Sequence, residues 1–141
     1  MKTTKTEVTT DLVIVKSAQD ERQILLIQRK NDPFKGKWAL PGGFVETDEN
    51  ILTGAARELK EETGIEVSEK DLHFIGYFDK PDRDPRGRVI SFAFTAEVSS
   101  DTKYQAGDDA KNAQWFYIKE LPELAFDHGE IINFYLRPKK L

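Results

Sequence analysis

The stretch GGFVETDENILTGAARELKEETGI, residues Gly42 to Ile65, contains the one helix that the sequence predicts strongly. Apolar residues recur with helical spacing from Ile51 to Thr63. Asn50 is a suitable N-cap, and Gly64 is a suitable residue to follow the last turn, because glycine readily adopts the left-handed conformation found there. The same stretch gathers three carboxylates within five residues near the end of the helix, and this crowding needs an explanation.

The three carboxylates share one side of the predicted helix. With about 100° per residue and Glu58 at zero, Glu62 lies at about 40° and Glu61 at about 300°. A neighbouring face, between roughly 60° and 160°, is apolar and suits a core. It consists of Leu52, Ala55, Ala56 and Leu59.

A solvated face is the ordinary explanation for a helix rich in glutamate and lysine, but two features argue against it. No lysine follows Glu58 by four residues, where it would form a stabilising pair. The helix dipole also disfavours anions near the C-terminal end. Clustered carboxylate oxygens are what a hard divalent cation needs, and Mg²⁺ takes its remaining ligands from water and substrate phosphates. The pattern therefore favours a metal site.

The spacing of the whole stretch is more specific still. Gly43 is followed by five residues, Glu49, seven residues and then RELKEETGI, which runs from Arg57 to Ile65. This arrangement resembles the complete box of the Nudix hydrolases, G-x5-E-x7-R-E-U-x-E-E-x-G-U, where U is aliphatic. All seven fixed identities and both aliphatic positions match. The resemblance extends over most of the chain and implies a single domain over residues 1–141. Its expected fold is an α/β/α sandwich with a mixed β-sheet and a loop–helix–loop metal site.

The resemblance implies a site for Mg²⁺ or Mn²⁺ bound against a diphosphate. Glu58 and Glu62 would be the principal ligands, with Glu61 beside them, and the backbone carbonyl of Gly42 would add a further ligand. A metal ion bound in this way neutralises charge on the leaving oxygen and lowers the pKa of an attacking water. The three glutamates are therefore the expected catalytic residues within the box.

The remaining box residues are expected to be structural. The resemblance implies that Glu49 and Arg57 pair and so hold the loop against the helix. Gly43 and Gly64 are the two glycines of the box, and a structural role is expected for both.

A base or further ligand is expected outside the box, on the loop before a late strand. The segment AGDDAKNAQW offers two acids there. We predict Asp109, with Asp108 as the alternative. Loops of this kind often carry acids only because they are solvated, and many Nudix enzymes use glutamate at this place.

The loop KPDRDPRGR, from Lys80 to Arg88, contains the candidates for substrate binding. Arg83, Arg86 and Arg88 gather three guanidiniums in six residues. Such a loop is often just an exposed connection, but guanidiniums bind phosphate oxygens with two parallel hydrogen bonds. This loop, Pro81 within it and the later string AFDH resemble the ADP-ribose pyrophosphatase branch of the family. ADP-ribose, split into AMP and ribose 5-phosphate, is therefore the expected substrate.

Two other side chains are candidates for substrate contact. Arg29 ends a predicted strand and could reach a phosphate, and Phe34 could stack on an adenine. Trp38 is expected in the core, because large aromatic side chains are mostly buried. His73 is expected to be structural, while His128 is either a packing residue at a helix start or a catalytic group.

The rest of the chain predicts strands and one further helix. The runs DLVIVK and QILLIQR, joined by SAQDER, predict a hairpin. Three more strands are predicted at LHFIGYF, RVISFAFTAEV and AQWFYI. A second helix is predicted from Asp127 to Arg137, opened by an Asp-x-x-Glu capping pattern. Strands interleaved with two helices indicate an α/β or α+β layer structure.

Composition excludes several classes of protein. The 141 residues, 38% hydrophobic and 33% charged, suit one globular domain. The net charge of −4 offers no basic footprint for nucleic acid, and the absence of cysteine excludes thiolate metal sites. The first ten residues lack the apolar core of a signal peptide, and the aliphatic runs are too short to cross a bilayer. We therefore expect a soluble, cytoplasmic protein with a small-molecule substrate and no nucleic-acid or membrane partner.

Two alternative functions stay open at this point. The same fold could act as a nucleoside triphosphate pyrophosphohydrolase, or as a non-catalytic ADP-ribose-binding sensor. Similar sensors carry a winged-helix DNA-binding segment, for which we expect no room before Leu141, and this sequence keeps every acid of the box. The resemblance also implies a homodimer, in which one subunit completes the adenosine site of the other.

Overall fold

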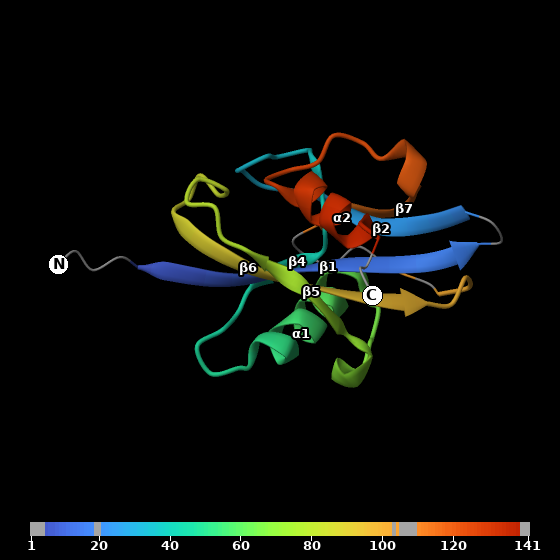
Figure 1. Cartoon of the computed structure of the whole chain (residues 1–141), viewed down its shortest axis with the longest axis horizontal. Helices are drawn as coiled ribbons and strands as arrows, with labels where there is room; N and C mark the ends of the chain where they lie inside the picture. The colour runs from blue at the N-terminus through green and yellow to red at the C-terminus, as the bar shows by residue number, and fades with distance from the viewer. Residues whose placement is uncertain (1–4, 19–20, 103, 105–109, 139–141) are drawn as a thin grey trace.

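The central feature of the molecule is a mixed β-sheet covered by one helix on each face (Figure 1). The computed structural model describes residues 5–18, 21–102, 104 and 110–138. Within them seven strands form one sheet, in the order β3-β2-β1-β6-β5, with β4 paired to β1 and β7 to β2. The expected α/β architecture with a mixed sheet is confirmed. The strands are β1 (Thr6–Ala18), β2 (Glu21–Arg29), β3 (Trp38–Ala39), β4 (Gly42–Phe44), β5 (His73–Phe78), β6 (Arg88–Val98) and β7 (Ala110–Tyr117).

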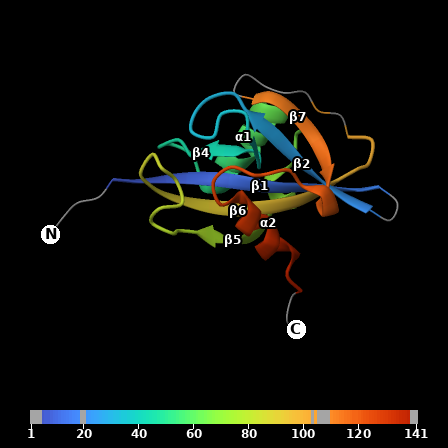
Figure 2. The same cartoon turned by 90° about the horizontal axis from the view of Figure 1, so that it is seen from above.

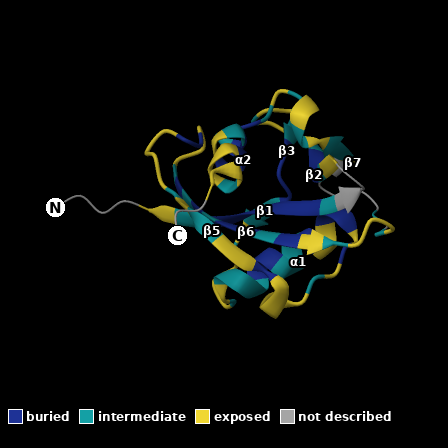
Figure 3. Cartoon of the chain, turned by 45° about the vertical axis from the view of Figure 1, so that its right-hand side comes forward, coloured by how far each residue is buried: buried dark blue, intermediate teal, exposed yellow. Residues whose placement is uncertain are grey.

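Strand β1 is the centre of the sheet. It pairs in parallel with β6 along most of its length and antiparallel with β2 and β4, so the predicted hairpin is confirmed. Its side chains alternate between two cores: Leu12 and Ile14 pack on one face, and Val13 and Val15 on the other. This explains the uninterrupted apolar run, since a strand covered on both faces needs apolar side chains on both (Figure 3).

Helix α1 spans Ile51–Thr63, the range that the sequence predicts. Ala55 and Leu59 are fully buried against the first of the two cores. The Asn50 side chain makes no capping hydrogen bond. Gly64 adopts φ 76°, and its N–H donates to a carbonyl of the last turn, which is the left-handed termination that the sequence predicts.

Helix α2 spans His128–Leu136 and covers the opposite face of the sheet. Ile131 and Ile132 are buried there, and Figure 2 shows α2 next to β5. The predicted capping role of Asp127 is wrong, because its carboxylate binds the guanidinium of Arg83 instead. Two short 3₁₀ turns, η1 (Glu69–Asp71) and η2 (Ile118–Glu120), complete the regular structure. In the described part of the chain, each helix is too short or too polar to traverse a lipid bilayer.

Candidate functional site

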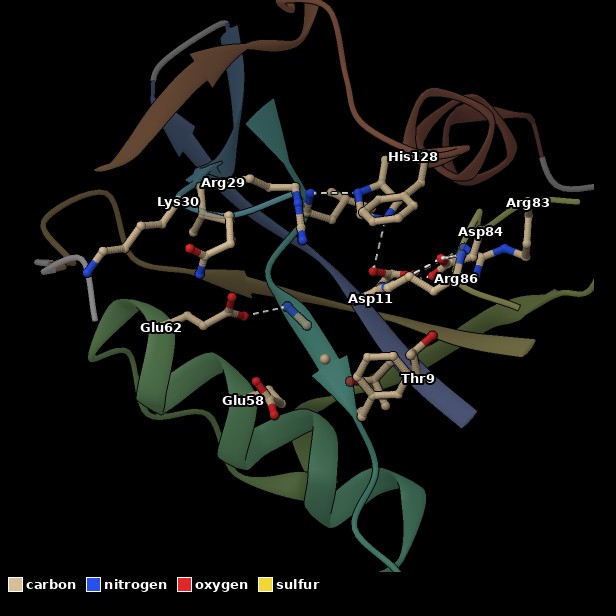
Figure 4. A pocket seen from close by; sticks show the side chains of 18 of the residues that line it. Thr9, Asp11, Arg29, Lys30, Glu58, Glu62, Arg83, Asp84, Arg86 and His128 are labelled. Atoms are coloured by element: carbon tan, nitrogen blue, oxygen red, sulfur yellow. Dashed lines mark hydrogen bonds and ion pairs between the residues drawn. The ribbon is translucent and has the colours of Figure 1, made fainter. Parts of the chain in front are cut away.

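Several of the sequence-predicted residues line one cavity of about 350 Å³ beside the junction of β1 and β4. Its walls come from β1, β2, β4, α1, the loop of residues 79–87 and the start of α2 (Figure 4). Acidic side chains of α1 lie on one side and basic side chains of β2 and the loop on the others. The side chains that line the cavity include Glu58, Glu62, Arg29, Arg86, Phe126 and His128.

Glu58 and Glu62 line the cavity from successive turns of α1 (Figure 4). Glu62 is only 6% exposed, and its Oε1 accepts the backbone N–H of Gly42 at 2.7 Å. The backbone of Gly43 approaches Glu58 so closely that an added Cβ would lie 2.6 Å from the carboxyl carbon. Glycine at this position therefore makes the room that the Glu58 carboxylate occupies.

Glu61 lies outside this pair. Its side chain is 58% exposed, it does not line the cavity, and its Oε2 accepts Arg57 Nη1 at 3.0 Å. The structure thus brings two of the three expected acids to the cavity and leaves the third at the surface of α1.

Arg57 connects the loop before α1 to the helix. Its Nε and Nη2 donate to both carboxylate oxygens of Glu49, at 3.0 and 2.7 Å, so the pair implied by the box is present. Its Nη1 also donates to Glu58 at 2.9 Å. Arg57 therefore offsets the crowding of acids, although no lysine follows Glu58 by four residues. These contacts raise the pKa of Arg57, with the Glu49 hydrogen bond as the largest cause.

The depressed pKa of Glu49 predicts a loss of stability in acid. The Arg57 hydrogen bond lowers the pKa of Glu49 from 4.5 to about 2. A carboxyl whose pKa is lower in the folded protein adds stability above its unfolded pKa and loses it as the pH falls through the folded value. Between pH 4.5 and about 2, the thermal midpoint should fall more steeply for wild type than for Glu49→Gln, measured by circular dichroism. Parallel curves would contradict this.

The basic side of the cavity is formed by Arg29 and Arg86. Burial lowers the pKa of Arg29, and the nearby charge of Arg86 lowers it further. Arg86 donates to both oxygens of Asp84, at 3.0 and 2.8 Å, and its guanidinium lies 4.8 Å from the Phe44 ring and 5.4 Å from the Phe126 ring. Arg29 donates from Nε to the carbonyl of Pro33 at 2.7 Å, and its guanidinium lies 5.0 Å from the Phe126 ring. Both cations are thus held at the wall, where an anionic ligand would meet them.

The structure separates the three arginines that the loop sequence groups together. Arg83 is buried and donates to both oxygens of Asp127, at 2.9 and 2.7 Å, and it lies 3.6 Å from Asp11. Burial opposes its charge, but the hydrogen bond to Asp127 and the nearby acids raise its pKa overall. Arg88 borders a second hollow and donates to a backbone carbonyl. Arg83 and Arg86 both line the cavity, but tertiary packing commits the guanidinium of Arg83 to an internal ion pair with Asp127. A role in substrate binding stays a prediction for all three arginines.

Phe34 lies beside the lining of the cavity, and its contact with a substrate stays a prediction. It does not line the cavity; it packs behind Phe126, which does, with ring centroids 4.7 Å apart. Phe126 adopts φ 52°, an uncommon conformation for a bulky residue that is often found at functional sites. Sequence reasoning missed Phe126, although it belongs to the AFDH string.

A buried polar network that the sequence did not predict forms part of the cavity wall. Asp11, 6% exposed, accepts the Ser91 hydroxyl and lies 3.1 Å from His128 Nε2. His128 Nδ1 accepts the backbone N–H of Leu40 at 3.0 Å. A charged residue at the start of an apolar strand was the available signal for Asp11.

Two carboxylates at the cavity, those of Glu58 and Glu62, could hold a metal ion. Within residues 5–18, 21–102, 104 and 110–138, no three histidine or acidic side chains gather around one ion position. The pair Glu58 and Glu62 nevertheless fits Mg²⁺, which commonly binds one or two carboxylates and completes its shell with water and phosphate. The predicted base, Asp109 with Asp108 as alternative, lies outside the described residues.

Comparison with known proteins gives a consistent result. A NUDIX domain model matches residues 7–135. The ADP-ribose pyrophosphatase of Methanocaldococcus jannaschii is 51% identical over 121 residues, which cover 86% of this chain and 70% of that protein.

Two solved structures are similar as well. The NUDIX domain of Shewanella oneidensis NrtR, complexed with ADP ribose, matches with a TM-score of 0.83 and 28% identity over 93% of this chain and 86% of that one. A bifunctional NMN adenylyltransferase/ADP ribose pyrophosphatase from Francisella tularensis matches with a TM-score of 0.83 and 34% identity over 96% of this chain. The match spans only 42% of that bifunctional protein.

Proposed function

The chain belongs to the Nudix family, and from this premise we propose that it hydrolyses ADP-ribose to AMP and ribose 5-phosphate with Mg²⁺ or Mn²⁺. One observation carries the proposal: the carboxylates of Glu58 and Glu62 and the guanidiniums of Arg29 and Arg86 border the same cavity. A diphosphate is an anion, so carboxylates would repel it unless a cation lay between them. The similarity to an archaeal ADP-ribose pyrophosphatase supports this choice of substrate.

Glu58 and Glu62 would hold the ion in this proposal. Bound there, it would supply charge neutralisation at the diphosphate and a more acidic water. The N–H of Gly42 fixes one oxygen of Glu62, and Arg57 binds Glu58 from outside the cavity. Both carboxylates are thus oriented by the protein itself, which is what an effective metal site requires.

Arg29 and Arg86 would bind phosphate oxygens from the other walls. Arg86 also borders the second hollow, of about 490 Å³, together with Phe44. Phe44 and Arg86 line both spaces, so the two hollows are neighbours, and we expect an arm attached to a diphosphate at the cavity to lie toward the second one. A diphosphate with a substituent at each end suits this arrangement better than a bare triphosphate.

The direct test is turnover of a substrate panel. With Mg²⁺ present, ADP-ribose should yield AMP, detected by chromatography, while dinucleotides and nucleoside triphosphates react more slowly. EDTA should abolish turnover, and added Mg²⁺ or Mn²⁺ should restore it, because without a cation the two carboxylates would repel the diphosphate. Pyrophosphate release from triphosphates with ADP-ribose untouched would select the triphosphate hydrolase instead.

A non-catalytic ADP-ribose sensor is the second candidate, because the matched NrtR domain is complexed with ADP ribose. Saturable ADP-ribose binding with no product in either metal would establish it. The base at Asp109, the homodimer and the cytoplasmic location remain predictions. Light scattering of the purified protein tests the dimer.

A further inference from the structure

The first residue of α2 contacts the segment that leads into the carboxylate pair. His128 is 4% exposed, and its Nδ1 accepts the N–H of Leu40 at 3.0 Å. Two residues later along the chain, the N–H of Gly42 donates to Glu62 Oε1 at 2.7 Å. A short backbone segment therefore connects a buried imidazole on one side of the sheet to a carboxylate of α1 on the other (Figure 4).

The end of this segment that contacts Glu62 is Gly42, which has no side chain and binds the carboxylate only through its backbone N–H. Residue 42 is glycine, which loses more conformational freedom on ordering than any other residue. Strand β1 holds the rest of the segment: the carbonyl of Pro41 accepts the N–H of Leu12 at 2.8 Å, and Gly42 pairs with Asp11 where β4 meets β1. Among the described residues, two side chains form hydrogen bonds with residues 40–42. One is Glu62 of α1, and the other is His128, which binds Leu40.

The imidazole itself is oriented from its other side. Because Leu40 N–H donates to Nδ1, the ring hydrogen is on Nε2, which lies 3.1 Å from Asp11 Oδ1. Asp11 is in turn bound by Ser91 and approached by Arg83 at 3.6 Å. The ring is therefore fixed in one tautomer and one orientation, with its acceptor nitrogen directed at the segment.

We propose that His128 is a positioning residue for the carboxylate pair: its Nδ1 holds Leu40, which places the Gly42 N–H where it orients Glu62. The effect on turnover rests on the proposed function, whereas the effect on the backbone does not. Contacts that orient metal ligands typically change affinity or activity by about 10–100-fold when they are lost.

Two substitutions separate the two contacts of the ring. In His128→Asn, the side-chain oxygen lies near the position of Nδ1 and keeps an acceptor for Leu40. In His128→Gln, the amide lies near the position of Nε2 and keeps the contact with Asp11 only. His73→Gln is the matched control, since His73 is exposed on β5.

The first readout needs neither metal nor substrate. In the metal-free protein, amide hydrogen exchange at Leu40 and Gly42 should be about tenfold or more faster in His128→Gln than in His128→Asn. The second readout is activation by Mg²⁺: the half-saturating concentration should rise roughly 10–100-fold in His128→Gln and stay within about threefold in His128→Asn. His73→Gln should match wild type in both.

Equal losses in the two His128 variants, or unchanged exchange at Gly42 in both, would overturn the proposal. Should neither variant fold, wild type still decides, because ¹⁵N shifts of His128 report which ring nitrogen carries the hydrogen. A hydrogen on Nδ1 rejects the proposal, and a hydrogen on Nε2 with a protected Leu40 amide supports it. If the exchange pattern is as expected but the wild-type protein does not turn over ADP-ribose, the proposed function is rejected and the positioning role of His128 is not.

Discussion

Replacing Glu62 by glutamine should lower ADP-ribose turnover by more than about a hundredfold, beyond the roughly 10–100-fold typical of lost supporting contacts in metal sites. Glutamine keeps the size of the side chain and an oxygen for the Gly42 N–H, which Glu62 accepts at 2.7 Å. It removes only the negative charge that would hold the cation. Steady-state release of AMP at saturating Mg²⁺ measures the effect.

The same variant should fold at least as well as wild type. Glu62 is 6% exposed, and burying a charged carboxylate costs free energy that a neutral amide avoids in large part. Without metal, the thermal midpoint of Glu62→Gln should equal or exceed that of wild type. A lower midpoint would mean that the activity loss reports damage to the fold and not the loss of a ligand.

Glu58→Gln should show a similar loss of turnover, and Glu61→Gln a smaller one because its side chain is 58% exposed. Glu66→Gln is the matched control: Glu66 is exposed and pairs only at the surface with Lys60, at 2.8 Å. Full activity in both Glu58→Gln and Glu62→Gln would refute the metal-dependent hydrolase.

The largest effect on stability is expected at Arg83. Its side chain is 3% exposed and binds Asp127, whose side chain is 10% exposed, while Asp11 is 8% exposed nearby. Arg83→Met would leave buried carboxylates without their cation, and breaking a buried pair from one side costs about 3–5 kcal/mol. Urea unfolding should report a loss of this size.

Two further variants separate the ion pair from general packing. In Arg83→Met combined with Asp127→Leu, much of the lost stability should return, because no uncompensated charge remains at that pair. Arg137→Met, at an exposed position after α2, should change the free energy of unfolding by no more than about 0.5 kcal/mol. A small loss in Arg83→Met would show that the pair is solvated.

Parts of this protein followed from local sequence alone. The bounds of α1 and its termination at Gly64 depend on residues close together in the chain. The pairing of Glu49 with Arg57 was expected from the resemblance to the Nudix box, and the structure contains it. Helix geometry also ranks the three acids by their distance from the apolar face: on the helical wheel Glu62 lies nearest to it and Glu61 farthest from it. The structure reproduces that order, with Glu62 buried and Glu61 exposed.

Only the tertiary structure decided which neighbours those residues meet. Three arginines close together in one loop have three different environments, because burial beside Asp127 requires Arg83 to be paired internally. His128 reaches Leu40 across 88 positions of the chain, and Asp11 reaches Ser91 across 80. Local periodicity carries no information about such contacts, because they form only when α2, β1 and β6 pack around one core.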